Sequence, residues 1–327
     1  CCMSILLLSA NCKIDSPSLD FESSFYVAYP PFVLMFGKEF FVNRYRLLGW
    51  EFRDVAPKQA IRINTMNVRG FNVVERLENL GIKLEKIPFL RDGYWVIRSD
   101  FSVGATVEYL LGYYSIQEAA AQVPATLFED LRDKLVLDAC AAPGGKTVQL
   151  ADLMDNTGVI VALDVNGQRL EALMNQLERC RVKNTVVYQM DARRVSNLGL
   201  KFDRILLDVP CSGNFATDKE WFKRRTLRDV ERNARLQRQI LAEAAKVLKA
   251  DGEIVYATCS LEPEENELNI DWAVRNLGLE TVEIDCYGEE ALTEVFGRKL
   301  DDSVRRCRRI WPGKTQGFFV CKLRRRR

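Results

Sequence analysis

The stretch LVLDACAAPGGKTVQLADLM, residues 135–154, decides the fold of this chain. Its opening, LVLDAC (135–140), is a short apolar run of the kind that forms a buried strand. A loop with glycines at 144 and 145 follows, and GGKTVQLADLM (144–154) then has the character of a helix. The stretch therefore predicts a strand, a tight loop and a helix, which is the repeating unit of a parallel sheet.

The same alternation continues toward the C-terminus. The further predicted strands are VIVALD (159–164), TVVYQMD (185–191), RILLDVP (204–210), EIVYATC (253–259) and GFFVCKL (317–323). The further predicted helices are QRLEALMNQLERC (168–180), Leu227–Leu248 and Glu264–Asn276. This order predicts an α/β fold with a Rossmann-like, doubly wound and mostly parallel sheet.

The first part of the chain alternates less regularly. It contains an aromatic-rich helical region (Phe32–Leu48), a helix near Asn72–Leu80, and the strand-like pieces IRINT, KLEKIP and GYWVI. We therefore predict a smaller α+β domain over residues 1–128 and the parallel-sheet domain over residues 129–327. A chain of 327 residues, 47% of them apolar, is long enough for two such domains.

Composition excludes several kinds of site. Histidine is absent, which removes Ser-His and Cys-His nucleophile pairs and zinc sites that contain histidine. The ten cysteines show no CxxC spacing, so we expect reduced intracellular thiols and no metal site. The apolar run in CCMSILLLSA is shorter than the roughly 7–15 residues of a signal core, and no stretch approaches the roughly 18 apolar residues of a membrane span. We expect a cytoplasmic protein without membrane contact.

Charge is distributed unevenly along the chain. The formal net charge is only +2, but Arg298–Arg327 holds twelve Lys/Arg against two Asp, which gives +10 there and −8 elsewhere. The stretch Lys219–Arg238 is also basic. Such asymmetry indicates a polyanion partner, although a solvated tail and helix face would produce the same pattern. For the terminal RRRR both interpretations stay open.

Acidic and thiol side chains stand at or just beyond the carboxyl ends of five successive predicted strands. These residues are Asp138, Asp164, Asp191, Asp208, Cys211 and Cys259. In an open parallel sheet, ligands bind beyond those ends, near the point where the strand order reverses. We therefore expect these side chains to share one site.

The first of these loops, CAAPGGKT (140–147), has glycines that would let a ligand approach the backbone. It matches neither GxGxxG nor GxxxxGK[ST], so it favours neither a dinucleotide nor a nucleoside triphosphate. Asp164 stands where a carboxylate binds ribose hydroxyls, and Asp191 could approach an adenine edge. An adenosine ligand without a phosphate cradle fits this set, and S-adenosylmethionine fits it best.

Two thiols beside such a ligand indicate carbon methylation. Carbon 5 of a pyrimidine is a poor nucleophile until a thiolate adds to carbon 6 and turns the ring into an enamine. A second thiol could then assist when the carbon 5 proton leaves and the enzyme is eliminated. Asp208, hydrogen-bonded to the amidine edge of the base, would stabilise the developing charge. These arguments do not decide whether Cys211 or Cys259 is the nucleophile.

The alternative is that the cysteines are small buried apolar residues, which is the commonest fate of cysteine. We adopt this interpretation for Cys12, Cys180, Cys286 and Cys321. Cys211 and Cys259 differ because they follow strands, inside the polar turns Pro-Cys-Ser-Gly and Thr-Cys-Ser. We therefore predict that these two are functional.

Three motifs together, AAPGGK, LLDVPCSG and ATCSLEPEEN, resemble the RsmB/NSUN family of RNA (cytosine-5) methyltransferases. The resemblance extends to IRINT, DGYWVI and GYYSIQEAAAQVPA upstream and to RRIWP and GFFVCKLRR downstream, and so covers roughly residue 60 onward. It implies a class I methyltransferase domain that uses S-adenosylmethionine. The compact, archaeal-like form favours tRNA as the substrate. One departure is GKTQ at 313–316, where the family often carries histidine.

The resemblance also implies roles for individual residues. Cys259 is the nucleophile, and Cys211 assists product release. Pro210 and Lys146 shape the pocket for the base. The residues implied to contact the cofactor are Cys140, Ala141, Ala142, Pro143, Gly144, Gly145, Lys146, Asp164, Arg169, Asp191 and Asp208.

The favoured hypothesis is thus a monomeric enzyme that makes 5-methylcytidine in RNA, with tRNA favoured over rRNA. An amine-directed methyltransferase is the first alternative, but Asp208–Cys211 reads DVPC rather than the Pro-Pro-aromatic motif of such enzymes. A non-catalytic RNA-binding protein is the second. Binding alone would need neither the two thiols nor the strand-end acids.

Overall fold

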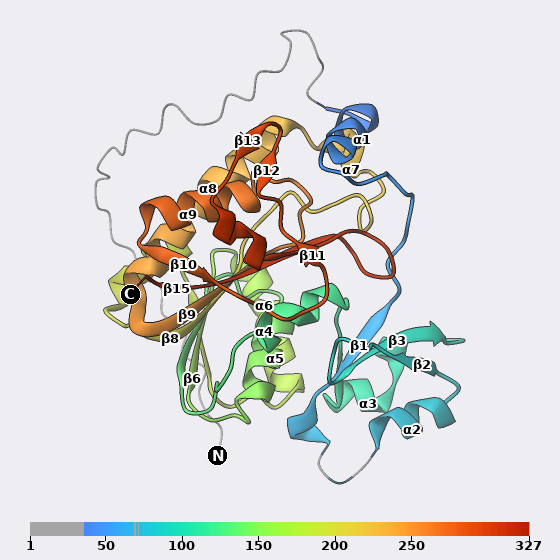
Figure 1. Ribbon diagram of the computed structural model, residues 1–327. Helices are drawn as coiled ribbons and strands as arrows, with labels where there is room; N and C mark the ends of the chain where they lie inside the picture. Colours follow the sequence, from blue (N-terminus) through green and yellow to red (C-terminus); the bar gives the residue numbers. More distant parts are fainter. Residues whose placement is uncertain (1–35, 69, 71, 327) are drawn as a thin grey trace.

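The computed structural model describes residues 36–68, 70 and 72–326, and it contains one large sheet and one small sheet (Figure 1). The predicted helical region Phe32–Leu48 forms helix α1 (Lys38–Leu47), and its first four residues lie outside the described part of the chain. Helices cover both faces of the large sheet, while the small sheet lies at one side of the molecule (Figure 1).

The large sheet has nine strands and confirms the predicted α/β fold. In spatial order they are β7 (Thr185–Gln189), β6 (Val159–Asp164), β5 (Leu135–Asp138), β8 (Phe202–Asp208), β9 (Leu248–Thr258), β15 (Phe318–Arg325), β14 (Arg308–Ile310) and β11 (Glu289–Glu290), with β10 (Leu279–Val282) also paired to β15. The strands β5 to β9 are mutually parallel, whereas β10, β11, β14 and β15 extend the sheet in antiparallel pairings. The sheet is therefore mixed, with its parallel half where the alternation predicts it.

The strand order reverses beside β5. From β5 the chain proceeds through β6 and β7 toward one edge, and then returns to place β8 and β9 on the other side. The carboxyl ends of β5 and β8 are adjacent, because Asp138 pairs with Leu206, and those of β8 and β9 are adjacent, because Asp208 pairs with Ala257. The loops after β5, β8 and β9 therefore meet at one place, where a doubly wound sheet forms its crevice.

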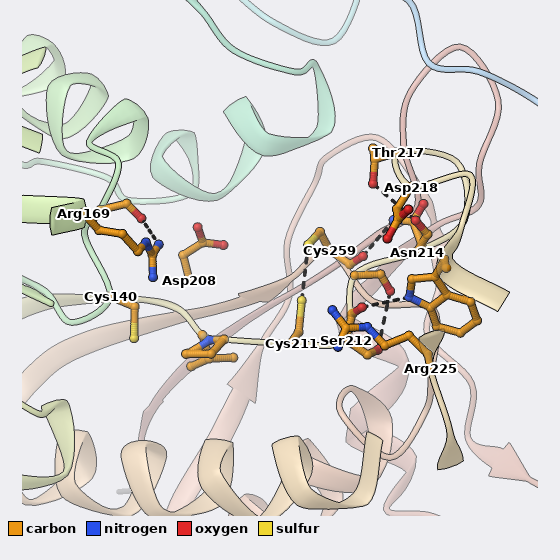
Figure 2. Close-up of a pocket in the computed structure, with 15 residues that line it drawn as sticks. Cys140, Arg169, Asp208, Cys211, Ser212, Asn214, Thr217, Asp218, Arg225 and Cys259 are labelled. Atoms are coloured by element: carbon orange, nitrogen blue, oxygen red, sulfur yellow. Dashed lines mark hydrogen bonds between the residues drawn. The ribbon is translucent and has the colours of Figure 1, made fainter. Parts of the chain in front are cut away.

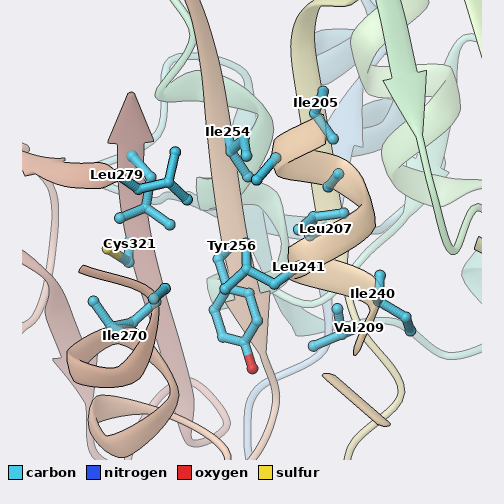
Figure 3. Packing of buried hydrophobic residues seen from close by; sticks show 14 of the residues in the cluster. Ile205, Leu207, Val209, Ile240, Leu241, Ile254, Tyr256, Ile270, Leu279 and Cys321 are labelled. Carbon is cyan, nitrogen blue, oxygen red and sulfur yellow. The ribbon is translucent and has the colours of Figure 1, made fainter. Parts of the chain in front are cut away.

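The helices pack in two layers. One layer contains α8 (Leu227–Val247) and α9 (Glu267–Asn276), and the other contains α4 (Val123–Thr126), α5 (Gly145–Leu153) and α6 (Gly167–Arg179). Figure 3 shows Leu241 of α8 and Ile270 of α9 packed against strand residues such as Ile254 and Leu279, all of which are buried.

Helix α8 begins at a capping box. The Thr226 hydroxyl accepts the Asp229 backbone N–H, and the Asp229 carboxylate accepts the Thr226 backbone N–H at 3.0 Å. This arrangement satisfies two backbone donors that a helix start would leave unpaired, so it fixes where the basic helix begins. The sequence places this helix at Leu227–Leu248, in agreement with its observed bounds.

The small sheet has the order β2 (Lys83–Lys86), β3 (Gly93–Arg98), β1 (Ala60–Ile63) and β4 (Tyr114–Ile116), and every pairing is antiparallel. Helix α2 (Val73–Asn79) lies beside it, so the three predicted strand-like pieces and the helix near Asn72–Leu80 are confirmed. The remaining elements are α3 (Val107–Leu110), α7 (Trp221–Arg224), β12 (Glu294–Val295), β13 (Arg298–Lys299) and the 3-10 helices η1 (Thr65–Asn67), η2 (Val103–Ala105), η3 (Ala120–Gln122), η4 (Ala192–Leu198) and η5 (Asp302–Arg306).

Two segments of the predicted N-terminal domain pack against the large-sheet region instead of the small sheet. Helix α1 contributes Phe41 and Tyr45 to a cluster with Trp221 and Leu261, and α4 contacts both α5 and β9. The boundary between residues 128 and 129 stays a prediction.

The basic C-terminal segment is part of the fold as far as residue 326. Arg324 pairs with Glu280 of β10 at 2.6 Å, and the Arg325 guanidinium donates to the Ala245 carbonyl at the end of α8 at 2.6 Å. Arg326 donates to the Val274 carbonyl of α9 at 3.2 Å. These contacts attach the three arginines to the fold although Arg324 and Arg326 are exposed, so the choice between a solvated tail and an RNA contact stays a prediction.

Candidate active site

Two thiols meet where β8 and β9 end. Cys211 lies three residues beyond Asp208, and Cys259 directly follows Thr258, the last residue of β9. Their Sγ atoms are 3.2 Å apart, and Figure 2 shows the two side chains pointing toward each other. Both are partly buried and carry free thiols, so the structure brings together the two cysteines that the sequence singles out.

The surroundings of Cys211 favour its protonated form. The hydrogen bond with Cys259 raises the pKa of the Cys211 thiol well above its usual value, and burial raises it further. A thiol that keeps its proton at neutral pH can donate it to a neighbouring sulfur. The two sulfurs are therefore suited to share one proton.

A buried carboxylate fixes the loop that carries Cys211. Glu265 accepts the Ser212 backbone N–H at 2.9 Å and the Ser212 hydroxyl at 2.6 Å. Gln237 of α8 donates to the Pro210 carbonyl at 2.8 Å, on the other side of the thiol. Burial raises the pKa of Glu265 to about 7. The position of Cys211 thus depends on residues from α8 and from the turn after β9.

Asn214 connects the two thiol loops directly. Its side-chain amide donates to the Cys259 carbonyl at 2.8 Å and to the Gly317 carbonyl at 3.1 Å. The Trp221 indole donates to the Ser212 carbonyl at 2.8 Å. Because these donors and acceptors are buried, losing one of them would leave a buried polar group without a partner.

Asp208 faces the same space from the end of β8. Its Oδ2 atom accepts a hydrogen bond from the Lys146 ammonium group at 2.7 Å. Burial lowers the pKa of Lys146, but the ion pair with Asp208 outweighs this effect and the pKa is raised. Asp208 Oδ1 has no hydrogen-bond partner among the described residues, so one carboxylate oxygen can accept from a ligand.

The glycines of the loop after β5 have different surroundings. Gly144 has φ +109°, and a Cβ atom there would lie 2.9 Å from Leu173 Cδ1 and 3.2 Å from Gln176 Cβ in α6. Gly145 begins α5, and the nearest atom to a Cβ there is Gln117 Cδ at 3.9 Å. Close packing against α6 therefore also requires glycine at 144, and the approach of a ligand to Gly144 and Gly145 stays a prediction.

The acids after β6 and β7 are paired with arginines. Asp164 is buried, accepts the Asn166 backbone N–H at 2.9 Å and lies 3.3 Å from the Arg169 guanidinium. Asp191 pairs with Arg193 at 2.6 Å, which lowers the pKa of Asp191 even though burial alone would raise it. A ligand that uses either carboxylate would share it with a guanidinium group.

Asp138 has a structural partner. Its Oδ2 atom accepts the Thr147 hydroxyl of α5 at 2.8 Å, and burial raises the pKa of Asp138 to about 7. Because Asp138 is fully buried, it anchors the helix that follows the glycine loop and does not face the cavity.

One cavity of about 320 Å³ joins the glycine loop to the thiols (Figure 2). Of the predicted site residues, those that line it are Cys140, Ala142, Arg169, Asp208, Pro210, Cys211 and Cys259. Those that do not are Ala141, Pro143, Gly144, Gly145, Lys146, Asp164 and Asp191. Polar or aromatic lining residues that sequence reasoning missed are Ser212, Asn214, Thr217, Asp218, Trp221 and Arg225.

Of the missed residues, Ser212 lies inside the LLDVPCSG motif and Asn214 directly follows it, so the motif could have identified them. Thr217 and Asp218 belong to a stretch without a sequence signal, and Arg225 lies in the basic stretch Lys219–Arg238, which gives no indication that it reaches the thiols.

The other cysteines fall as expected where the structure describes them. Cys180 and Cys321 are buried and Cys286 is partly buried, whereas Cys12 lies outside the described residues. Across residues 36–326, apart from the two omitted positions, no group of three or more Cys, Asp or Glu could hold a metal ion. No helix in that part of the chain has the length and apolarity to cross a membrane.

Comparison with known proteins gives consistent matches. The family model described as 16S rRNA methyltransferase RsmB/F matches residues 125–324, and the model for the N-terminal domain of 16S rRNA methyltransferase RsmF matches residues 39–119. These matches confirm the family resemblance and the methyltransferase fold. They leave the role of each site residue a prediction.

Individual relatives act on different RNAs. A 28S rRNA (cytosine-C(5))-methyltransferase of Mus musculus is 34% identical, over 91% of this chain and 39% of the mouse protein. A tRNA (cytosine(49)-C(5))-methyltransferase of Pyrococcus abyssi is 33% identical, over 88% of this chain and 96% of that protein. The crystal structure of NSun6 from Pyrococcus horikoshii with SFG, an S-adenosylmethionine analogue, has a TM-score of 0.75 at 26% identity, over 90% of this chain and 96% of that chain. The chain spans between 35% and 58% of the length of five curated relatives.

Proposed function

This chain belongs to the 16S rRNA methyltransferase RsmB/F family, and on that premise we propose that it methylates carbon 5 of cytosine in RNA. The observation that carries the proposal is the pair of thiols 3.2 Å apart, beyond two neighbouring strands and in a cavity that also reaches the glycine loop. An enzyme that methylates an amine needs no covalent attachment to the base, so it has no use for such a pair.

S-adenosylmethionine would supply an activated methyl group. The residues suited to hold it are those of the loop Cys140–Lys146, together with Asp164, Arg169 and Asp191. Cys140, Ala142 and Arg169 line the same cavity as the thiols, so a ligand on this loop would face the two sulfurs. The Asp164 carboxylate would accept hydrogen bonds from the ribose hydroxyls. Arg169 would either keep its ion pair with this carboxylate or give it up when the ligand binds.

Cys259 would act as the nucleophile. Its thiolate forms a bond to carbon 6 of cytosine, and the electron pair of the 5,6 double bond moves to give an enamine with a nucleophilic carbon 5. After methylation a base removes the carbon 5 proton, the double bond re-forms, and the bond between carbon 6 and Cys259 breaks. Cys211 lies beside Cys259, and its thiol would assist this elimination by giving its proton to the departing Cys259 sulfur.

Asp208 would position the base. Lys146 holds one of its oxygens, and the other can accept a hydrogen bond from the exocyclic amine of cytosine. This contact would orient the ring so that carbon 6 faces Cys259.

We further propose tRNA as the substrate. The Pyrococcus abyssi tRNA enzyme aligns over 96% of its own length, whereas the mouse rRNA enzyme aligns over only 39% of its length. Almost every part of that tRNA enzyme therefore has a counterpart in this chain, and this supports the choice.

Methylation of defined transcripts tests the proposal. The protein is incubated with labelled S-adenosylmethionine and either tRNA or rRNA transcripts, and the product is sequenced after bisulfite treatment. We expect bisulfite-resistant cytosines in tRNA with the wild-type protein and none with Cys259→Ala. Nucleoside mass spectrometry that finds the methyl group on an exocyclic amine would contradict the thiol chemistry, and exclusive labelling of rRNA would contradict the substrate.

A further inference from the structure

A second and larger cavity, of about 750 Å³, lies across one loop from the thiols. Phe215 and Ala216 of this loop line the larger cavity, whereas Thr217 and Asp218 line the cavity that contains Cys259. The loop that contains Phe215 to Asp218 therefore separates the two cavities. A polymer with one unit at the thiols would have its adjoining units close to the second cavity.

Aromatic rings form one side of the larger cavity. Phe215 and Phe222 are stacked, with ring centroids 5.2 Å apart and an interplanar angle of 15°, and Phe52 lies 5.0 Å from Phe215. Phe36 also lines the cavity and is 50% exposed. Phe215 is buried and Phe52 and Phe222 are half-buried, so the ring surface open to a ligand belongs to Phe36, Phe52 and Phe222. Nucleobases stack on accessible aromatic rings irrespective of sequence.

Lysines surround these rings. Lys38, Lys219 and Lys223 line the cavity and are exposed, while Asp54 is the one acidic residue that lines it. Lys223 pairs with Glu220 at 2.9 Å, whereas Lys219 has no carboxylate within ion-pair distance among the described residues. Rings and cations together suit a ligand with a flat base and a phosphate, whereas an apolar peptide would need only the rings.

We propose that this aromatic and lysine-lined cavity binds a nucleotide that flanks the target cytosine in the RNA strand. The base stacks against the Phe52 and Phe222 rings, and its phosphate contacts Lys219. The cavity volume falls within the roughly 300–1,000 Å³ of small-ligand sites, so one nucleotide fits. The inference rests on the proposed function, because it places a neighbour of the methylated base.

RNA affinity tests the aromatic contact. The probe is a fluorescein-labelled single-stranded RNA of roughly ten nucleotides that contains cytosine, and binding is followed by fluorescence anisotropy. We expect Phe222→Ala to weaken binding at least about 5-fold, the lower end of what one lost stacked base costs. Phe222→Trp should bind like the wild type, because the indole ring also stacks. Equal weakening in both variants would indicate a packing role and overturn the inference.

Lys219→Ala tests the phosphate contact without disturbing the core. Losing one phosphate contact should reduce the slope of log K against log salt by about 0.7. The matched control is Lys183→Ala, an exposed lysine outside the cavity, and the aromatic control is Tyr287→Ala, an exposed ring that stacks on Phe89. Lys219→Ala with an unchanged slope, or Phe222→Ala with unchanged affinity, would overturn the inference.

A photocrosslink locates the nucleotide. The same RNA with 5-iodouridine beside its cytosine is irradiated on the wild-type protein, and we expect crosslinked peptides that contain Phe52 or Phe222. Crosslinks confined to other surfaces would overturn the inference. Methylation assays separate the two proposals: if the wild type methylates RNA but Phe222→Ala retains wild-type affinity, only the flanking-nucleotide site fails. If no RNA is methylated at carbon 5, the proposed function fails.

Discussion

At the residue scale, the Sγ atoms of Cys211 and Cys259 lie 3.2 Å apart, and either sulfur can donate the hydrogen bond between them. The hydrogen bond to Cys259 and burial raise the pKa of Cys211, which favours its thiol form. In our proposal Cys259 attacks and Cys211 acts on departure because their Thr-Cys and Pro-Cys turns match those positions of the family pattern. The sequence chemistry alone leaves the two residues equivalent.

Replacing each of the two thiols should therefore block the reaction at a different step. Cys259→Ala should abolish methyl transfer and any covalent RNA adduct, because no bond to carbon 6 can form. Cys211→Ala should still attack and methylate, then stall as an adduct that survives a denaturing gel. Cys286→Ala, a partly buried cysteine outside the cavity, serves as the control and should behave like the wild type. An adduct in Cys259→Ala and none in Cys211→Ala would reverse the roles.

Glu265 makes the stability of this loop dependent on pH. Burial raises its pKa to about 7, above the value of an unfolded carboxyl group, so the folded state binds more protons between about pH 4.5 and 7. The folded state therefore becomes less stable, relative to the unfolded state, as pH rises through that window. Above pH 7 the loop retains an ionised carboxylate held by Ser212.

Glu265→Gln should remove this dependence and retain both contacts, because the Ser212 hydroxyl can accept as well as donate. From pH 5 to pH 8 we expect the unfolding free energy of the wild type to fall by roughly 2 kcal/mol relative to the variant. Urea unfolding at the two pH values measures this difference. A constant difference between the two proteins would show that Glu265 is not protonated in the folded state.

At the element scale, the turn after Cys259 is fixed by a helix more than 200 residues earlier in the chain. Arg44 of α1 pairs with Glu262 at 3.0 Å and with Glu264 at 2.7 Å, and all three side chains are buried. Burial raises the pKa of Glu262, and the positive charge of Arg44 opposes that effect. The nucleophile loop therefore depends on α1, an element that the sequence assigns to a different domain.

Replacing Arg44 should lower the free energy of unfolding. Arg44→Ala would leave two buried carboxylates without their cation, which typically costs about 3–5 kcal/mol. Arg46→Ala is the matched control on the same helix, since Arg46 and Glu51 lie 3.6 Å apart and both are exposed, and it should change stability by less than about 0.5 kcal/mol. Denaturant unfolding compares the two. Similar losses in both variants would mean that the helix matters and the buried ion pair does not.

At the scale of the whole molecule, the parts of the fold that follow from sequence are those with local signals. The run VIVALD and the capping residue Thr226 mark β6 and the start of α8 without any tertiary information. The strands β10, β11 and β14 have two to four residues and exist only through pairing with distant partners, so no periodicity indicates them. The short antiparallel strands could not be predicted for this reason.

The residues of the site also divide into those that sequence motifs identify and those that only tertiary contacts reveal. Motifs identify Cys211 and Cys259, because a thiol after a strand is visible in the sequence itself. The role of Glu265 was not predictable, because it depends on a contact with Ser212 across 53 residues. In the +10 segment, counting charges cannot show that Arg324 forms an ion pair with Glu280.

This placement of cations decides where RNA should bind. The C-terminal arginines are largely occupied within the fold, whereas Arg228 and Arg235 of α8 are exposed and have no carboxylate of a described residue within ion-pair distance. Cations that are free to pair with phosphate release condensed counterions, so RNA binding should weaken steeply with salt. The basic stretch Lys219–Arg238 is therefore a better candidate for the RNA surface than the terminal arginines.

Each of Arg228→Ala and Arg235→Ala should lower the slope of log K against log salt by about 0.7 to 0.9, the contribution of one phosphate contact. Arg324→Ala should leave the slope unchanged, because its charge is balanced by Glu280 at 2.6 Å in the folded protein. Fluorescence anisotropy with a labelled tRNA transcript over a series of salt concentrations gives the three slopes. A reduced slope for Arg324→Ala, with unchanged slopes for both α8 variants, would place the RNA on the C-terminal strand instead.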